Sequence, residues 1–277
     1  MAYERTAWAT GDVVTAERLN KMEGGIAASP LDGMSLAFLG DSWCAGSGDG
    51  AGGWARLVGE AFPGATVTNK GHYGADWAQA AGFHCPHSGD ATDPLPDELD
   101  YLVVEAYTNG LYAEPVEQDG KRGVIDKFGR LKRFGSASDA HWDGDAAWQA
   151  AYPGDTATYA AECDWVLGSL ARRYAGGGTR LLVIAPYRAP SQWPKSAGEH
   201  ASGEGFAEFL PAVGALAAKW GYDFLDRFTT SPIPSWSWDA SVPYMWHKDG
   251  GEVDATHLGL AGNRRVLGPI VDAILAL

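Results

Sequence analysis

Five short runs of apolar or β-branched residues recur along the chain, and each is a candidate strand of a parallel sheet. They are residues 35–43, 65–71, 101–109, 179–187 and 222–226. Segments with apolar residues at helical spacing lie among them, at 54–61, 156–174, 205–220 and 259–277. This alternation of strands and helices predicts an α/β protein in which helices cover both faces of a parallel sheet.

Two segments do not follow this pattern. Residues 16–26 are expected to form a short helix with an apolar stripe too narrow to stabilise it alone, so it must pack on the main domain, on a second copy or on another protein. Residues 111–151 show no steady period, which is typical of an insertion that shapes a binding site. We therefore expect an N-terminal docking segment at 1–30 and one domain at 31–277.

The composition excludes several functions. Thirty-five acidic residues against 21 basic ones give a formal net charge of −14, which would repel a nucleic acid. No apolar stretch reaches the roughly 18 residues of a membrane span, and no signal peptide is recognisable at the start. The three cysteines at positions 44, 85 and 163 lack metal-ligand spacing and indicate neither a zinc site nor a disulfide framework.

The first strand ends in Gly40-Asp41-Ser42. A serine in a tight turn after a strand is exposed, and ligands bind at this end of the strands in open α/β sheets. Serine nucleophiles need a base in a fixed tautomer and donors for an oxyanion. The tripeptide alone is weak evidence, because ordinary turns contain the same residue types.

A second candidate, Asp254-Ala255-Thr256-His257, precedes the last helix. A carboxylate three residues before a histidine can bond one ring nitrogen and leave the other facing a nucleophile. The alternative is an aspartate that caps a helix beside a structural histidine. We expect a loop at this position.

Together these two pieces resemble the SGNH (GDSL-like) hydrolase family, and two further blocks fit the resemblance. The family's glycine turn after the second strand is matched by residues 69–76, with Gly74, and its asparagine turn after the third strand by residues 106–111, with Asn109. The resemblance covers about residues 34–277. It implies a three-layer α/β/α, flavodoxin-like fold with a central, mostly parallel, five-stranded sheet.

The resemblance also implies a mechanism. Ser42 would attack an ester carbonyl, His257 would take the serine proton, and Asp254 would orient the imidazole. The oxyanion would be held by the backbone N–H groups of Ser42 and Gly74 and by the side-chain amide of Asn109. No metal or other cofactor is expected for this chemistry.

The third block departs from the family at two positions. Tyr107 stands where the family has glycine, and Gly110 where aspartate is common. The bulky Tyr107 is expected to change the turn or to line the pocket, and Trp246 and His72 are further candidates for substrate binding. The other histidines are expected to be incidental, although His84 could also line the site.

Twelve tryptophans are many for this length, and three of them, at 236, 238 and 246, lie shortly before the Asp254–His257 segment. Indole faces stack on sugar rings, although most tryptophans simply pack in cores and loops. No apolar lid helix suited to lipid is visible. The favoured substrate is therefore a small acyl group, such as acetyl, on a saccharide.

Residues 8–26 resemble a short leader of bacteriophage tail-associated and baseplate-associated proteins. This resemblance implies a virion protein that deacylates a host surface glycan and docks to a phage structural protein, or to a second copy, through residues 1–30. Two alternatives stay open: a cellular, cytoplasmic esterase or thioesterase for small acyl substrates, and a catalytically idle glycan-binding tail module on the same fold.

Overall fold

A parallel sheet of five strands forms the centre of the computed structural model, which describes residues 29–46, 53–85, 91–111, 115–125, 131–136, 158–188 and 204–277. The strand order is β2-β1-β3-β7-β8, and every neighbouring pair is parallel. The strands are β1 (Ser35–Gly40), β2 (Thr66–Gly71), β3 (Tyr101–Glu105), β7 (Arg180–Ile184) and β8 (Asp223–Leu225). All five runs therefore contain the strands that the sequence predicts.

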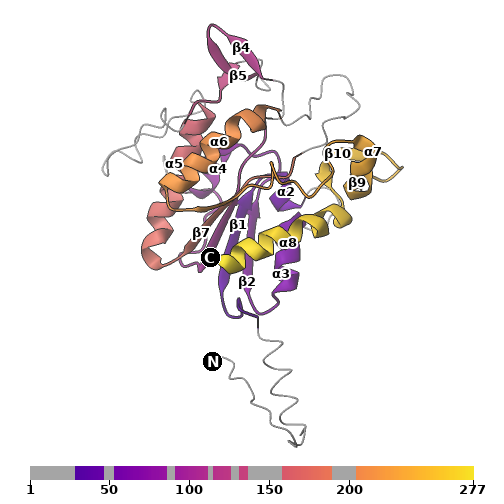
Figure 1. Ribbon diagram of the computed structural model, residues 1–277. Helices are drawn as coiled ribbons and strands as arrows, with labels where there is room; N and C mark the ends of the chain where they lie inside the picture. Colours follow the sequence, from indigo (N-terminus) through magenta and orange to yellow (C-terminus); the bar gives the residue numbers. More distant parts are fainter. Residues whose placement is uncertain are drawn as a thin grey trace, which may run out of the picture.

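Helices cover both faces of this sheet (Figure 1). Helices α3 (Gly53–Ala61) and α8 (Leu260–Ala276) pack on one face. Helices α4 (Trp77–His84), α5 (Tyr159–Tyr174) and α6 (Glu204–Lys219) pack on the other. The predicted three-layer α/β/α architecture with a five-stranded sheet is confirmed. The predicted helix at residues 16–26 lies outside the described residues.

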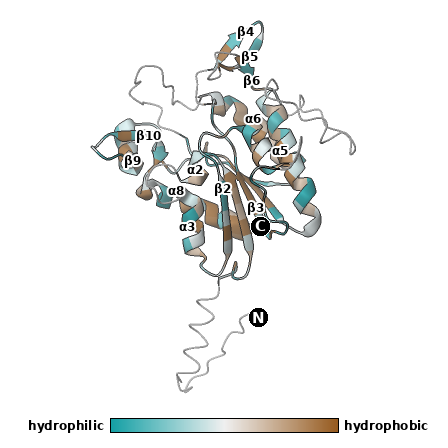
Figure 2. Ribbon diagram, turned by 180° about the vertical axis from the view of Figure 1, so that it is seen from behind, coloured by the Kyte–Doolittle hydropathy of each residue, from teal (hydrophilic) through white to brown (hydrophobic). Residues whose placement is uncertain are grey.

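Alternate residues of each central strand point to opposite faces of the sheet, as the two-residue period of a strand requires. In β1, Ala37 and Leu39 belong to the core under α4, α5 and α6, whereas Leu36 and Phe38 belong to the core under α3 and α8. Because both faces are buried there, the central strands β1, β3 and β7 are mostly apolar, as Figure 2 shows for the centre of the sheet.

Helix α4 was not predicted from the apolar pattern, although its start carries a recognisable signal. The Asp76 side chain accepts a hydrogen bond from the N–H of Gln79, and the Gln79 side chain accepts one from the N–H of Asp76. This reciprocal capping box fixes the first turn. The helix spans only eight residues, too few to show a clear helical period.

Part of the expected insertion at 111–151 folds as a small antiparallel sheet. Its strands are β4 (Val116–Gln118), β5 (Lys121–Ile125) and β6 (Leu131–Arg133), and β4 and β5 project beyond the ends of α5 and α6 (Figure 1). Arg122 on β5 donates two hydrogen bonds, of 2.7 and 2.6 Å, to the carboxylate of Glu208 on α6. The insertion is thus tied to the helical layer.

Smaller elements complete the described fold: α2 (Ser42–Ala45), η2 (Ala175–Gly177), α7 (Trp238–Ser241), η3 (Val242–Tyr244), β9 (Met245–His247) and β10 (Val253–Leu258). No helix in the described ranges combines the length and apolar character of a membrane span. The three cysteines are buried and form no disulfide with one another, and burial raises the pKa of each thiol.

A buried ion pair joins the ends of two strands. Arg227, just after β8, donates to the Glu105 carboxylate at the end of β3 over 2.6 Å, and both side chains are 1% exposed. Trp54 Nε1 donates to the other Glu105 oxygen over 3.2 Å. Burial raises the pKa of Glu105 to about 7, against the opposing effect of Arg227. The cation therefore offsets the cost of burying this carboxylate.

Replacing Arg227 by methionine should lower the free energy of unfolding by about 3–5 kcal/mol, because Glu105 is left buried without its cation. Without the cation the pKa of Glu105 rises further above its unfolded value. Glu105 in the variant then binds its proton at a pH above the wild-type pKa of about 7, so the variant should regain stability relative to wild type as the pH falls to about 7, with no further relative gain below it.

Urea denaturation at several pH values measures both effects. The double variant Arg227→Met/Glu105→Gln is the control, since it leaves no uncompensated charge and should lose less than the single variant. Equal losses in the single and double variants would contradict the account.

Candidate active site

The nucleophile candidate Ser42 lies where the end of β1 turns directly into α2. A Cβ atom on Gly40 would lie 2.7 Å from the Cβ of Cys44 and 2.9 Å from that of Glu105. A Cβ atom on Gly71, at the end of β2, would lie 2.4 Å from the backbone nitrogen of Ala45. Only glycines at these two positions allow α2 to sit against the strand ends, and this places Ser42 at the carboxyl edge of the sheet.

The structure brings together the three side chains that the sequence predicts. The Nε2 atom of His257 lies 3.0 Å from Ser42 Oγ, although 215 positions separate the residues. The Nδ1 atom of His257 lies 3.2 Å from Asp254 Oδ1. All three side chains are partly buried, and the contacts form one chain from hydroxyl to imidazole to carboxylate.

The segment that carries Asp254 and His257 is strand β10, which corrects the predicted loop. β10 pairs with β9 antiparallel, and its register shifts between Asp254 and Leu258. Asp254 Oδ1 accepts hydrogen bonds from the backbone N–H groups of Thr256 (2.7 Å) and His257 (2.9 Å). An irregular strand can therefore place a carboxylate and an imidazole on the same side despite their spacing of three.

Asp254 is held in its ionised form. Partial burial alone would raise the pKa of this carboxyl group, but the hydrogen bonds from His257 and from the two backbone N–H groups outweigh burial and hold the pKa at about 2. An ionised carboxylate accepts a hydrogen bond from Nδ1, so the proton of a neutral imidazole sits on Nδ1. Nε2 then faces Ser42 with its lone pair, as a general base requires.

Asp41, next to the nucleophile, organises the strand ends around it. Its buried carboxylate accepts hydrogen bonds from the Trp43 N–H (3.1 Å), the Thr108 N–H (3.0 Å) and the Thr108 hydroxyl (2.6 Å). Burial raises the pKa of Asp41, and these bonds oppose the rise. The sequence does not indicate a separate role for Asp41, and no motif identifies Thr108, 67 positions away, as its partner.

Asn109, a predicted oxyanion donor, uses both hydrogens of its amide within the protein. One goes to the carbonyl of Ala75 over 2.7 Å and the other to Asp41 Oδ2 over 3.3 Å. The first bond ties Asn109 to the turn after β2. The second is long and therefore the weaker of the two.

The turn after β2 holds Gly74 in a backbone conformation with φ of +73°, which favours glycine. Its N–H group has no acceptor among the described residues, and neither has the N–H group of Ser42. Both groups are thus available to a ligand at this end of the sheet.

Tyr107 does not form a wall of the site. Its side chain is 1% exposed and packs edge-to-face on Trp77 of α4, with ring centroids 5.1 Å apart. The aromatic ring fills the core between the sheet and α4, so its prediction as a substrate-binding residue is wrong in this structure. Gly110, the other departure from the family pattern, has φ of +87°, which the turn after β3 requires.

The remaining predicted residues lie beside the site and stay predictions. Trp246 on β9 is opposite Asp254 in the β9–β10 register and is partly exposed. His72 follows β2, and its Nε2 atom contacts Asp93 over 2.8 Å. Lys248, which the sequence did not single out, places its ammonium 3.9 Å from the free carboxylate oxygen of Asp254.

This chain is similar to known proteins in its fold. No protein-family model and no curated protein matches the chain. A protein from Lactobacillus plantarum matches with a TM-score of 0.55 and 15% identity, over 88% of this chain and 97% of that one. A possible lipase from Chitinophaga pinensis matches with a TM-score of 0.54 and 13% identity, over 88% and 98%.

A third similar structure is an acetylxylan esterase from Geobacillus stearothermophilus. The TM-score is 0.50 and the identity 15%, over 88% of this chain and 94% of the esterase. At such identities the likeness shows the fold. The chain shares this fold with the acetylxylan esterase over 88% of its length.

Thr108→Val should lower the free energy of unfolding by about 1–3 kcal/mol, because the buried carboxylate of Asp41 loses its shortest hydrogen bond while the side-chain volume is kept. Thr108→Ser is the matched control, which keeps the hydroxyl and loses one methyl group. Chemical denaturation of both variants compares the two effects. A serine variant that is less stable than the valine variant would contradict the assigned role of the hydroxyl.

Proposed function

We propose that this protein is a serine esterase of the SGNH type that hydrolyses small acyl esters, most suitably O-acetyl groups on a saccharide. The observation that carries the proposal is the 3.0 Å contact between Ser42 Oγ and His257 Nε2, with Asp254 on the opposite side of the imidazole. This arrangement is the geometric signature of an activated serine, and it is recognised by geometry and not by order in the chain.

The reaction proceeds through an acyl-enzyme. Ser42 Oγ attacks the ester carbonyl carbon while His257 Nε2 takes the hydroxyl proton, and the ionised Asp254 stabilises the resulting imidazolium. His257 then gives that proton to the departing alcohol oxygen as the ester C–O bond breaks. In the second half, His257 takes a proton from water, the hydroxide attacks the acyl carbon, and the acid leaves as Ser42 regains its proton.

The N–H groups of Ser42 and Gly74 are the proposed oxyanion donors, because neither has an acceptor among the described residues. Asn109 contributes through its second hydrogen, whose bond to Asp41 is 3.3 Å long and therefore easily exchanged for one to an oxyanion. Its first hydrogen, bonded to Ala75, keeps the asparagine and the Gly74 turn together. One such donor is worth about 3 kcal/mol of barrier.

Exposed aromatic side chains support a saccharide substrate. Tyr73, directly before Gly74, is 69% exposed, and Trp236 is 72% exposed. Exposed aromatic faces are suited to stacking on sugar rings. A structure of similar fold is that of an acetylxylan esterase, which supports an acylated saccharide as the proposed substrate class. Three further tryptophans of the chain, Trp142, Trp148 and Trp193, lie outside the described residues.

The test is acetate release from acetylated bacterial polysaccharides. Ser42→Ala should lower the rate at least about a thousandfold, since only binding and oxyanion effects remain. Asp254→Asn should also lower it about a thousandfold or more, because the imidazolium loses its counter-charge. The asparagine retains Oδ1 as acceptor for the Thr256 and His257 N–H groups, so folding is preserved. Release by Ser42→Ala at the wild-type rate would overturn the proposal.

The biological setting that we propose is a bacteriophage particle, in which the enzyme acts on a host surface glycan. Support comes only from the leader-like residues 8–26, which lie outside the described residues. Mass spectrometry of purified particles should detect the chain in fixed proportion to the tail proteins. Its presence only in infected-cell lysate would contradict a virion role and favour a cellular esterase.

A further inference from the structure

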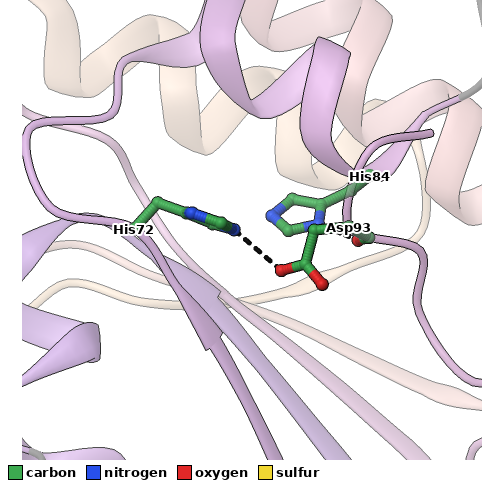
Figure 3. A group of neighbouring side chains, drawn as sticks. All are labelled: His72, His84 and Asp93. Carbon is green, nitrogen blue, oxygen red and sulfur yellow. Dashed lines mark hydrogen bonds and ion pairs between the residues drawn. The ribbon is translucent and has the colours of Figure 1, made fainter.

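We propose that His72, His84 and Asp93 form a binding site for one divalent transition-metal ion, with Zn²⁺ as the best-fitting ion. The three residues come from different segments: His72 follows β2, His84 ends α4, and Asp93 lies between α4 and β3. Figure 3 shows the two imidazoles and the carboxylate converging on one space. This site lies outside the Ser42–His257–Asp254 group and does not depend on the proposed esterase activity.

The ligand atoms have the right separation. One ligand atom from each residue lies within 4.8 Å of the others, and His72 Nε2 lies 2.8 Å from Asp93 Oδ2. In tetrahedral zinc with bonds of about 2.0–2.1 Å, ligand atoms lie about 3.3–3.4 Å apart. The His72–Asp93 separation is shorter than this value, and the limit of 4.8 Å on the other separations is compatible with it. A shift of about half an ångström opens the His72–Asp93 pair and admits the ion in place of the shared proton.

His84 gives the strongest indication of a ligand. Its side chain is 1% exposed, and its Nδ1 atom lies 3.0 Å from the backbone carbonyl of Asp93. A carbonyl only accepts, so Nδ1 carries the proton and Nε2 carries a lone pair. That Nε2 atom is buried without a hydrogen-bond partner, and it points toward His72 (Figure 3). A buried polar atom without a partner is costly, and a metal ion would satisfy it.

The surroundings of both histidines are those of metal ligands. Imidazoles that bind metal usually donate their other N–H to a carbonyl or carboxylate, as His84 does to Asp93. The His72 ring stacks on Phe83 at 3.9 Å between centroids and 17° between planes, which restricts its orientation.

The ammonium group of Lys70 would compete with a metal ion for the carboxylate of Asp93. Its ammonium pairs with the other carboxylate oxygen of Asp93, so the pocket already attracts a cation. A divalent ion bound by one carboxylate retains a positive charge and would repel this ammonium. The Lys70 side chain is 24% exposed and can turn toward solvent. Removing its charge should therefore strengthen metal binding.

Bound metal would brace the turn that carries Gly74. The N–H group of His72 donates to the Gly40 carbonyl over 3.0 Å, and the His72 carbonyl accepts from Ala75 over 3.2 Å. A metal ion that holds the His72 side chain would therefore also stabilise the backbone hydrogen bonds of His72 to Gly40 and Ala75. With three protein ligands, water would fill the fourth tetrahedral position. The ion would stabilise this turn, and no proton or acyl transfer passes through it.

The experiment is a Zn²⁺ titration of the tag-free, full-length chain after treatment with a chelator, followed by competition with a chromogenic chelator. We expect one ion per chain with a dissociation constant of about 1 μM or lower. His72→Ala should weaken binding by about tenfold or more, and this partly exposed residue can be replaced without a buried cavity. Lys70→Gln should bind at least as tightly as wild type.

His247→Ala is the matched control, because His247 is exposed and its side chain bonds just the Val242 carbonyl, over 3.0 Å, among the described residues. It should leave stoichiometry and affinity unchanged. Co²⁺ added to the metal-free chain should give visible absorption bands that Zn²⁺ removes and that His72→Ala lacks. Absence of stoichiometric binding, or binding that His72→Ala does not weaken, would overturn the proposal and leave a hydrogen-bonded cluster only.

Discussion

The buried carboxylate of Asp41 connects the parts of the protein that the site requires. It lies at the junction of β1 and α2, caps the turn that exposes Ser42, and accepts two hydrogen bonds from Thr108 after β3. Through Asn109 it also reaches the turn after β2. A carboxylate buried this deeply is stable only with several donors. The three strand ends are thereby fixed relative to one another, and the nucleophile with them.

His257, the proposed base, is held next to Ser42 by contacts other than those of Asp41. His257 belongs to the β9–β10 pair, which precedes α8 and is held by the packing of α8 against α3 and the sheet. Tyr187, after β7, donates from its hydroxyl to the carbonyl of Thr256. The sheet therefore anchors His257 as well as Ser42. This common anchoring explains how two residues so distant in sequence come within proton-transfer distance.

Sequence patterns predicted the sheet and the triad because each rests on a local signal. Buried parallel strands are continuous apolar runs. The motifs Gly40-Asp41-Ser42 and Asp254-x-x-His257 each have their functional residues within a few positions of one another. The features that these patterns did not predict depend on contacts between residues that are far apart in the sequence. The burial of Tyr107 depends on Trp77, and the strand form of Asp254–His257 depends on pairing with β9. The His72–His84–Asp93 cluster likewise has no local spacing that would reveal it.

The account rests on the contact between Ser42 and His257, and covalent labelling by a fluorophosphonate tests it most directly. Peptide mass spectrometry of the folded chain should find one adduct, on Ser42, which forms far more slowly in His257→Ala because the serine proton then has no acceptor. A folded wild-type chain that stays unlabelled, or labelling of Ser42 that is indifferent to His257, would contradict the claim that this imidazole activates this serine.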